Sequence, residues 1–112
     1  MKTTKTKRFA EPMTWEEMQQ ENAARIAATE QAVKEAICKL GFRRDTKYVA
    51  CECYDRDGLR IAFFSDDERC ELYAFTGAPG HSSVAYELNL PFAIPPQVLV
   101  ATITAAVKAD AS

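Results

Sequence analysis

The sequence predicts an α+β domain with the element order α-β-β-β-β-α: a long N-terminal helix, a four-stranded antiparallel β-meander and a short C-terminal helix. Three observations lead to this prediction: a helical segment with capping residues at both ends, four alternating segments separated by polar turns, and a proline pair that opens a last apolar stripe. The 112 residues suit one domain. We therefore expect a single domain over residues 14–112, preceded by a basic, flexible N-terminal tail over residues 1–13.

The first helix is the best-marked element. Thr14 suits the N-cap, and Glu17, three residues later, completes a capping box. Gly41 suits the left-handed position just after a helix, and Phe42 suits the hydrophobic contact of a Schellman motif. Because most residues between these signals are strong helix formers, we expect a helix over Trp15–Leu40.

This helix is longer than the sheet it should cover. Its apolar stripe runs through the second half, at Ile26, Val33, Ile37 and Leu40. A helix over Trp15–Leu40 is about 39 Å long, whereas a strand of seven residues spans only about 23 Å. We therefore expect the first two or three turns to extend past the sheet, together with Met13, Trp15 and Met18.

The strands are expected where apolar and polar residues alternate, at Tyr48–Tyr54, Leu59–Phe64, Cys70–Thr76 and Val84–Leu90. Polar turns separate them, and Gly58 suits a turn position with positive φ. We expect these side chains to face the core: Val49, Cys51, Cys53, Leu59, Ile61, Phe63, Cys70, Leu72, Ala74, Val84, Tyr86, Leu88 and Leu90. The last helix is expected from about Pro96 to Ala109.

The charge distribution bears on the class of partner. The chain has a net charge of −2, and four of its basic residues lie in the tail, at Lys2, Lys5, Lys7 and Arg8. The remaining body is acidic, which disfavours direct binding of nucleic acid. The sequence contains no apolar run long enough to span a membrane and no signal peptide. We expect a cytoplasmic protein with reduced thiols.

The cysteines and the histidine are the candidates for a metal or catalytic site. Cys51 and Cys53 share one face of a predicted strand, about 7 Å apart, and Cys38 and Cys70 could approach them. His81 lies in a Gly/Pro loop, where no nucleophile motif accompanies it. We expect the cysteines to be small core residues, with no metal, no cofactor and no catalytic residue. The alternative is a cysteine-based metal-binding protein or small enzyme.

The outward face of the sheet is the first candidate binding surface. It carries Arg60 and five aromatic residues, Tyr48, Tyr54, Phe64, Tyr73 and Phe75. These rings suit a partner-binding or self-association face; if the two helices cover opposite faces of the sheet, they are core instead. A small nucleic-acid-binding domain is a further alternative. The element order resembles that of double-stranded-RNA-binding domains, but the last helix has one lysine, Lys108, and no basic cluster at its start, so we reject that family.

The overhanging helix end is the second candidate. Trp15, flanked by Met13 and Met18 and by Glu16, Glu17 and Glu21, suits a protein-binding hot spot; alternatively, Met13 and Met18 form a staple against the sheet edge.

The sequence therefore favours a non-enzymatic protein-binding module, an inhibitor or adaptor with a protein partner and with homodimerisation as an open possibility. A phage- or mobile-element-encoded inhibitor of a host nucleoprotein defence complex, of the anti-CRISPR type, would fit. The glutamates of the helix would then compete with nucleic acid for a basic groove: Glu16, Glu17, Glu21, Glu30 and Glu35.

Overall fold

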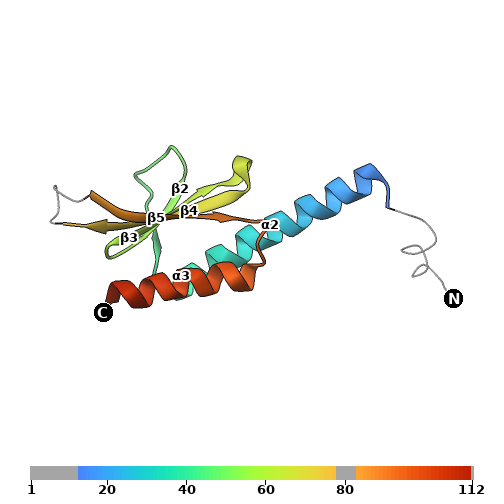
Figure 1. The fold of residues 1–112 in the computed structure, drawn as a ribbon. Coiled ribbons are helices and arrows are strands. Elements are labelled where there is room, and N and C mark those ends of the chain that lie inside the picture. Colours follow the sequence, from blue (N-terminus) through green and yellow to red (C-terminus); the bar gives the residue numbers. More distant parts are fainter. Residues whose placement is uncertain (1–12, 78–82, 112) are drawn as a thin grey trace.

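The computed structural model describes residues 13–77 and 83–111 and shows an α+β fold (Figure 1). The predicted tail, apart from Met13, lies outside the described residues, and so does His81. The elements in chain order are α2 (Trp15–Lys39), β1 (Arg43–Arg44), β2 (Glu52–Arg56), β3 (Leu59–Phe64), η2 (Ser65–Asp67), β4 (Arg69–Thr76), β5 (Ser83–Pro91) and α3 (Pro96–Ala111). None of the described helices is both long enough and apolar enough to cross a membrane.

Both ends of α2 form as the sequence predicts. The Thr14 hydroxyl accepts from the Glu17 amide at 3.1 Å, and the Glu17 carboxylate accepts from the Thr14 amide at 2.9 Å, which is a complete capping box. At the other end Gly41 has a φ of 96°, and the Phe42 amide donates to the Ile37 carbonyl at 3.0 Å. This is the long hydrogen bond of a Schellman motif, so the helix ends as predicted.

The sheet is an antiparallel meander with the spatial order β1-β2-β3-β4-β5, one strand more than predicted. The added strand is short: Arg43 and Arg44 pair with Asp55 and Tyr54 of β2. This pairing also explains why the strand predicted over Tyr48–Tyr54 begins only at Glu52. Since β1 and β2 are antiparallel neighbours, the chain must reverse between them, and residues 45–51 make that connection.

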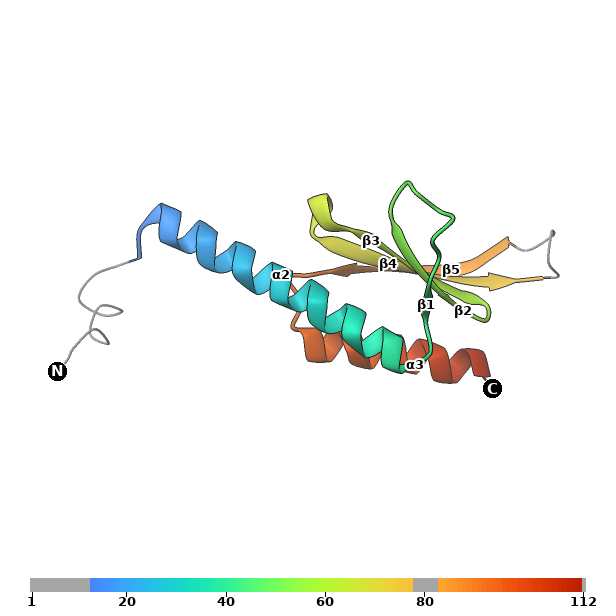
Figure 2. The same cartoon turned by 180° about the vertical axis from the view of Figure 1, so that it is seen from behind.

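Both helices lie on the same face of the sheet (Figures 1 and 2). This face, the helix side, holds the core: Val33 and Ile37 of α2, Ile61 of β3, and Leu99 and Ile103 of α3 are all buried. The opposite face is the open side, and no helix among the described residues covers it. The alternative in which the helices cover opposite faces is therefore wrong.

Two strand faces differ from the prediction. Tyr54, expected to point outward, pairs with Ile61 and is buried on the helix side, 5.6 Å from the Phe63 ring centre. Cys51 and Cys53 consequently face the open side, although they were predicted to face the core. The alternation in β2 defines two faces, but only its register with β3 decides which face meets the helices.

The second difference comes from a β-bulge. The register between β4 and β5 shifts at Ala74 and Phe75, so that Phe75 pairs with Val84. Val84 was predicted to face inward. The bulge adds one unpaired residue to β5, and this addition turns the Val84 side chain to the open side beside Phe75.

The turn between β2 and β3 also differs in detail: its residue with positive φ is Asp57, at 50°, and not Gly58. The Gly58 carbonyl instead accepts a hydrogen bond from the Phe75 amide at 2.8 Å.

The start of α2 extends past the sheet, as its length predicts (Figure 2). Met13, Trp15 and Met18 are all exposed there. Trp15 precedes Val33 by about five helical turns, so both residues lie on the same side of the helix. Val33 is 0% exposed and Trp15 is 67% exposed. The core-facing stripe of α2 thus continues onto a segment that no other described part of the chain covers.

Candidate functional site

The open side of the sheet contains a hollow of about 310 Å³. We call it the open-face hollow, and its lining residues come from the 45–51 loop and from four strands: Tyr48, Ala50, Cys51, Cys53, Arg60, Ala62, Phe64, Tyr73, Phe75 and Val84. Most of these side chains are apolar or aromatic, and three of the larger ones, Tyr48, Phe75 and Val84, remain exposed. An apolar concavity on an uncovered sheet is a surface suited to binding.

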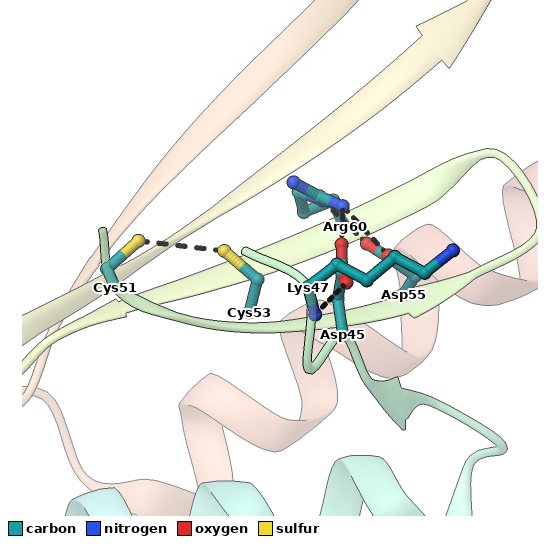
Figure 3. A network of polar contacts seen from close by, with 6 residues as sticks. All are labelled: Asp45, Lys47, Cys51, Cys53, Asp55 and Arg60. Atoms are coloured by element: carbon teal, nitrogen blue, oxygen red, sulfur yellow. Dashed lines mark hydrogen bonds and ion pairs between the residues drawn. The ribbon is translucent and has the colours of Figure 1, made fainter. Parts of the chain in front are cut away.

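Arg60 holds one wall of the hollow (Figure 3). Its guanidinium donates to Asp55 at 2.6 and 2.9 Å and to Asp45 at 2.6 Å, and it lies 5.4 Å from the centre of the Tyr48 ring. The Lys47 amide also donates to Asp45, at 3.0 Å. This backbone bond and the Arg60 charge lower the pKa of Asp45, although desolvation opposes them. The single bond to Asp45 therefore ties the loop to β3, while the bidentate contact ties β3 to Asp55 of β2.

A second arginine, Arg69, contacts the hollow's lining residue Phe64. The Arg69 guanidinium lies 4.6 Å from the centre of the Phe64 ring and forms an ion pair with Glu71. Glu71 also accepts a hydrogen bond from the Tyr73 hydroxyl, and this bond, followed by desolvation, raises the pKa of Tyr73. The Tyr73 ring in turn lies 6.5 Å from the Phe75 ring. The aromatic side chains are thus oriented by polar contacts between neighbouring residues of the sheet.

The two open-side cysteines lie closer together than a regular strand predicts. Their sulfur atoms are 3.6 Å apart (Figure 3), whereas the strand spacing predicts about 7 Å. Burial, followed by the neighbouring Cys51, raises the pKa of Cys53 to about 11. The other two cysteines are elsewhere: Cys70 is buried in the core on the helix side, and Cys38 is exposed on α2. Among the described residues, no three Cys, His, Asp or Glu side chains are grouped to hold a metal ion.

The structure brings together most, but not all, of the predicted binding residues. Tyr48, Arg60, Phe64, Tyr73 and Phe75 all line the open-face hollow. Tyr54 does not; it lies on the other side of the sheet, where its hydroxyl donates to Glu52 at 2.6 Å. The residues of the α2 overhang form a separate surface: Met13, Trp15, Glu16, Glu17, Met18 and Glu21.

The sequence reasoning missed Ala50, Cys51, Cys53, Ala62 and Val84 as parts of the hollow. The two small residues and Val84 carry no chemical signal of their own. The cysteines were noticed but assigned to the core, because their face depends on the β2–β3 register.

The chain was compared with models of protein families, with curated proteins and with solved structures, and none of them matches it. The open-face hollow and the α2 overhang are therefore the two features from which we infer a function.

Proposed function

We propose that this protein is a non-enzymatic protein-binding module that docks a partner protein on the open side of its sheet. The observation that supports this best is the open-face hollow, an apolar concavity on a sheet face that the described helices leave bare. A partner would insert one apolar or aromatic side chain between Tyr73, Phe75 and Val84. Aromatic residues in such a central position contribute strongly to protein–protein affinity.

The size of the hollow favours a side chain over a whole cofactor. Small-molecule sites enclose roughly 300–1,000 Å³, and about 310 Å³ is at the lower limit of that range. Two of its polar side chains are also engaged within the domain, since Arg60 binds two carboxylates and the Tyr73 hydroxyl donates to Glu71. An apolar anchor needs none of these groups, and a charged ligand would have to displace them.

The electrostatics favour a partner whose anchor is flanked by basic residues. Acidic side chains surround the hollow, with Asp45 and Asp55 near Arg60 and Glu87 beside Tyr73. Nucleic acid would meet these carboxylates, and Arg60 in the hollow and Arg69 next to Phe64 are already paired. A basic peptide segment would be attracted to the rim, which increases the rate of association.

The overhang of α2 supplies a second contact surface. Trp15 and Met18 continue the core-facing stripe, and Glu16 and Glu21 are exposed beside them. Glu30, by contrast, binds Lys34 at 2.8 Å and Ser65 at 2.7 Å. Within our proposal this acidic end would compete with nucleic acid for a basic groove, as an inhibitor of a nucleoprotein complex of the anti-CRISPR type would do.

A selection experiment tests the main docking surface. Peptides with one aromatic or aliphatic anchor between Lys or Arg residues are displayed and selected on immobilised protein, and affinities are measured by fluorescence anisotropy. Val84→Ser should weaken binding about tenfold, which is the loss of one anchor contact. Val98→Ser is the matched control, because Val98 on α3 is 52% exposed and Val84 is 50% exposed; its affinity should stay that of the wild type.

Two results would overturn the proposal. One is a selection that enriches no peptide, or only peptides that bind Val84→Ser as tightly as the wild type. The other is tight binding of single-stranded RNA at low salt that Tyr73→Ala abolishes, which would make the open side a nucleic-acid surface. Sedimentation of the free protein with Trp15→Ala alongside shows separately whether a second copy occupies the overhang.

A further inference from the structure

Cys51 and Cys53 line the open-face hollow, but the docking proposal assigns them no role. In a regular strand, residues two apart are separated by about 6.6–6.8 Å, and their side chains run parallel. Here the sulfur atoms point toward each other and lie 3.6 Å apart (Figure 3). The reason is local: the backbone bends at Cys51, and β2 begins only at Glu52.

We propose that Cys51 and Cys53 form a redox modification site, at which a small-molecule disulfide converts the dithiol to an intrachain disulfide that reshapes the open-face hollow. The modification itself does not depend on the docking function. Its effect on partner binding rests on the proposed function.

The surroundings of the pair decide which side moves when the bond forms. A disulfide brings two sulfur atoms to about 2.04 Å, so the pair must close by about 1.5 Å. Cys53 is held, because it pairs with Ala62 and its carbonyl accepts from the Asp45 amide at 2.9 Å. Cys51 precedes the paired part of β2. The displacement therefore falls on Cys51 and on the 45–51 loop that carries Tyr48.

This displacement reaches the wall of the hollow. Tyr48 lies over Arg60, and Arg60 is fixed between Asp45 and Asp55. Pulling the end of the loop toward Cys53 changes the position of the Tyr48 ring relative to Arg60, while the strands that carry Phe75 and Val84 stay in place. The reduced and oxidised proteins would therefore present hollows of different shape.

The reaction proceeds by two exchanges. The Cys51 thiolate attacks one sulfur of the small-molecule disulfide, and the first thiolate leaves. The Cys53 thiolate then attacks the Cys51 sulfur, and the second thiolate leaves. The two protons of the cysteine thiols end on the two released thiols, so the protein is oxidised by two electrons and the small molecule is reduced by two. Cys51 acts first because it is half-buried, whereas Cys53 is only 1% exposed.

The other cysteines cannot replace either partner in the folded monomer. Cys70 lies on the helix side of the sheet with 0% exposure, and Cys38 lies on the exposed side of α2 near its end. Intracellular disulfides that do form are commonly transient and redox-sensing, and an adjacent resolving thiol is the usual arrangement.

The test uses the full-length wild-type protein and oxidised glutathione. After acid quenching and alkylation, trypsin releases Tyr48–Arg56, since it cuts after Lys47 and Arg56. We expect this peptide to lose two hydrogen atoms and to escape alkylation. After reduction, both of its cysteines should again be alkylated. In the Cys53→Ser variant glutathione should remain attached to Cys51. In nuclear magnetic resonance spectra, oxidation should shift Tyr48 and leave Val98 unchanged.

Three results would overturn the inference. They are a wild-type peptide that keeps both alkylated cysteines, a glutathione adduct on Cys51 that never resolves while Cys53 is present, and a disulfide that forms without any shift at Tyr48. The variant Cys38→Ser is the control for the mass measurement, because loss of the Cys38 thiol should leave the oxidation of the Tyr48–Arg56 peptide unchanged. Each of these outcomes can be read whether or not a docking partner is ever found.

Discussion

The two faces of the sheet are built by the same strands, but they meet different environments. Along β3, Ile61 and Phe63 are buried under the helices, whereas Arg60 before them and Phe64 after them face the open side. On the helix side, apolar groups meet apolar groups. On the open side, the rings are held by arginines and carboxylates and remain half-exposed. The helix side therefore supplies most of the stability of the domain, and the open side remains available for contact.

The largest expected difference between the faces is in thiol reactivity. Burial raises the pKa of Cys70 to about 12, so on the order of one thiol in ten thousand is ionised at pH 8. We expect the exposed Cys38 of α2 to react with iodoacetamide first, Cys51 of the open side next, and Cys70 of the helix side far more slowly than either. Peptide mass spectrometry over a time course measures the order. In urea all four cysteines should react at similar rates. Fast labelling of Cys70 in the native protein would contradict its burial in the core on the helix side.

The next effect compares two residues on opposite faces of β4, Leu72 and Phe75. Leu72→Ala on the helix side should lower the free energy of unfolding by about 2–5 kcal/mol, because Leu72 is fully buried and the change leaves a cavity. Phe75→Ala on the open side should lower it by less than about 1 kcal/mol, since the ring is already exposed. Urea unfolding of both variants gives the two values, and equal losses would mean that the open side is covered in solution.

A smaller effect separates the two halves of α2. Thr14→Ala removes the capping hydrogen bond and should destabilise the first turns by about 1 kcal/mol. Because the overhang extends past the sheet and its apolar side chains are exposed, this loss should stay local. Native-state hydrogen exchange should therefore quicken at Met18 and not at Val33. Thr102→Ala is the control, since its hydroxyl donates to the Val98 carbonyl within α3. A matching fall in global stability would mean that the overhang is docked.

The smallest effect concerns the tie between Arg60 and the loop. The pKa of Asp45 in the folded protein is lower than its ordinary value of 3.8. Its ionised carboxylate therefore stabilises the folded loop fully above pH 3.8, and this stabilisation is lost as the pH falls through the folded pKa. The protection of the loop amides, residues 46–50, relative to an unfolded chain should therefore be independent of this group between pH 5 and pH 7 and should fall below its folded pKa. Arg60→Gln should lower this protection at pH 7 as well. No change in either experiment would mean that Arg60 does not hold the loop.

Local signals predicted the parts of this fold that depend on a few neighbouring residues. The capping box at Thr14, the Schellman end at Gly41 and the strand Leu59–Phe64 all form as predicted. The strand Arg43–Arg44 could not be predicted, because two charged residues carry no alternation and are held only by pairing with β2. The same holds for the position of Val84, which depends on a bulge opposite Ala74.

Local patterns in the sequence predict the two helices, four of the five strands, their order and the overhang of α2, because hydrophobic periodicity, caps and turns act over a few residues. Three features follow only from tertiary contacts: both helices cover one face, Tyr54 turns inward, and Cys51 and Cys53 turn outward and approach each other. This limit comes from the period of two in a strand. Alternation defines two faces, and register, set by pairing across the sheet, decides which of them is buried.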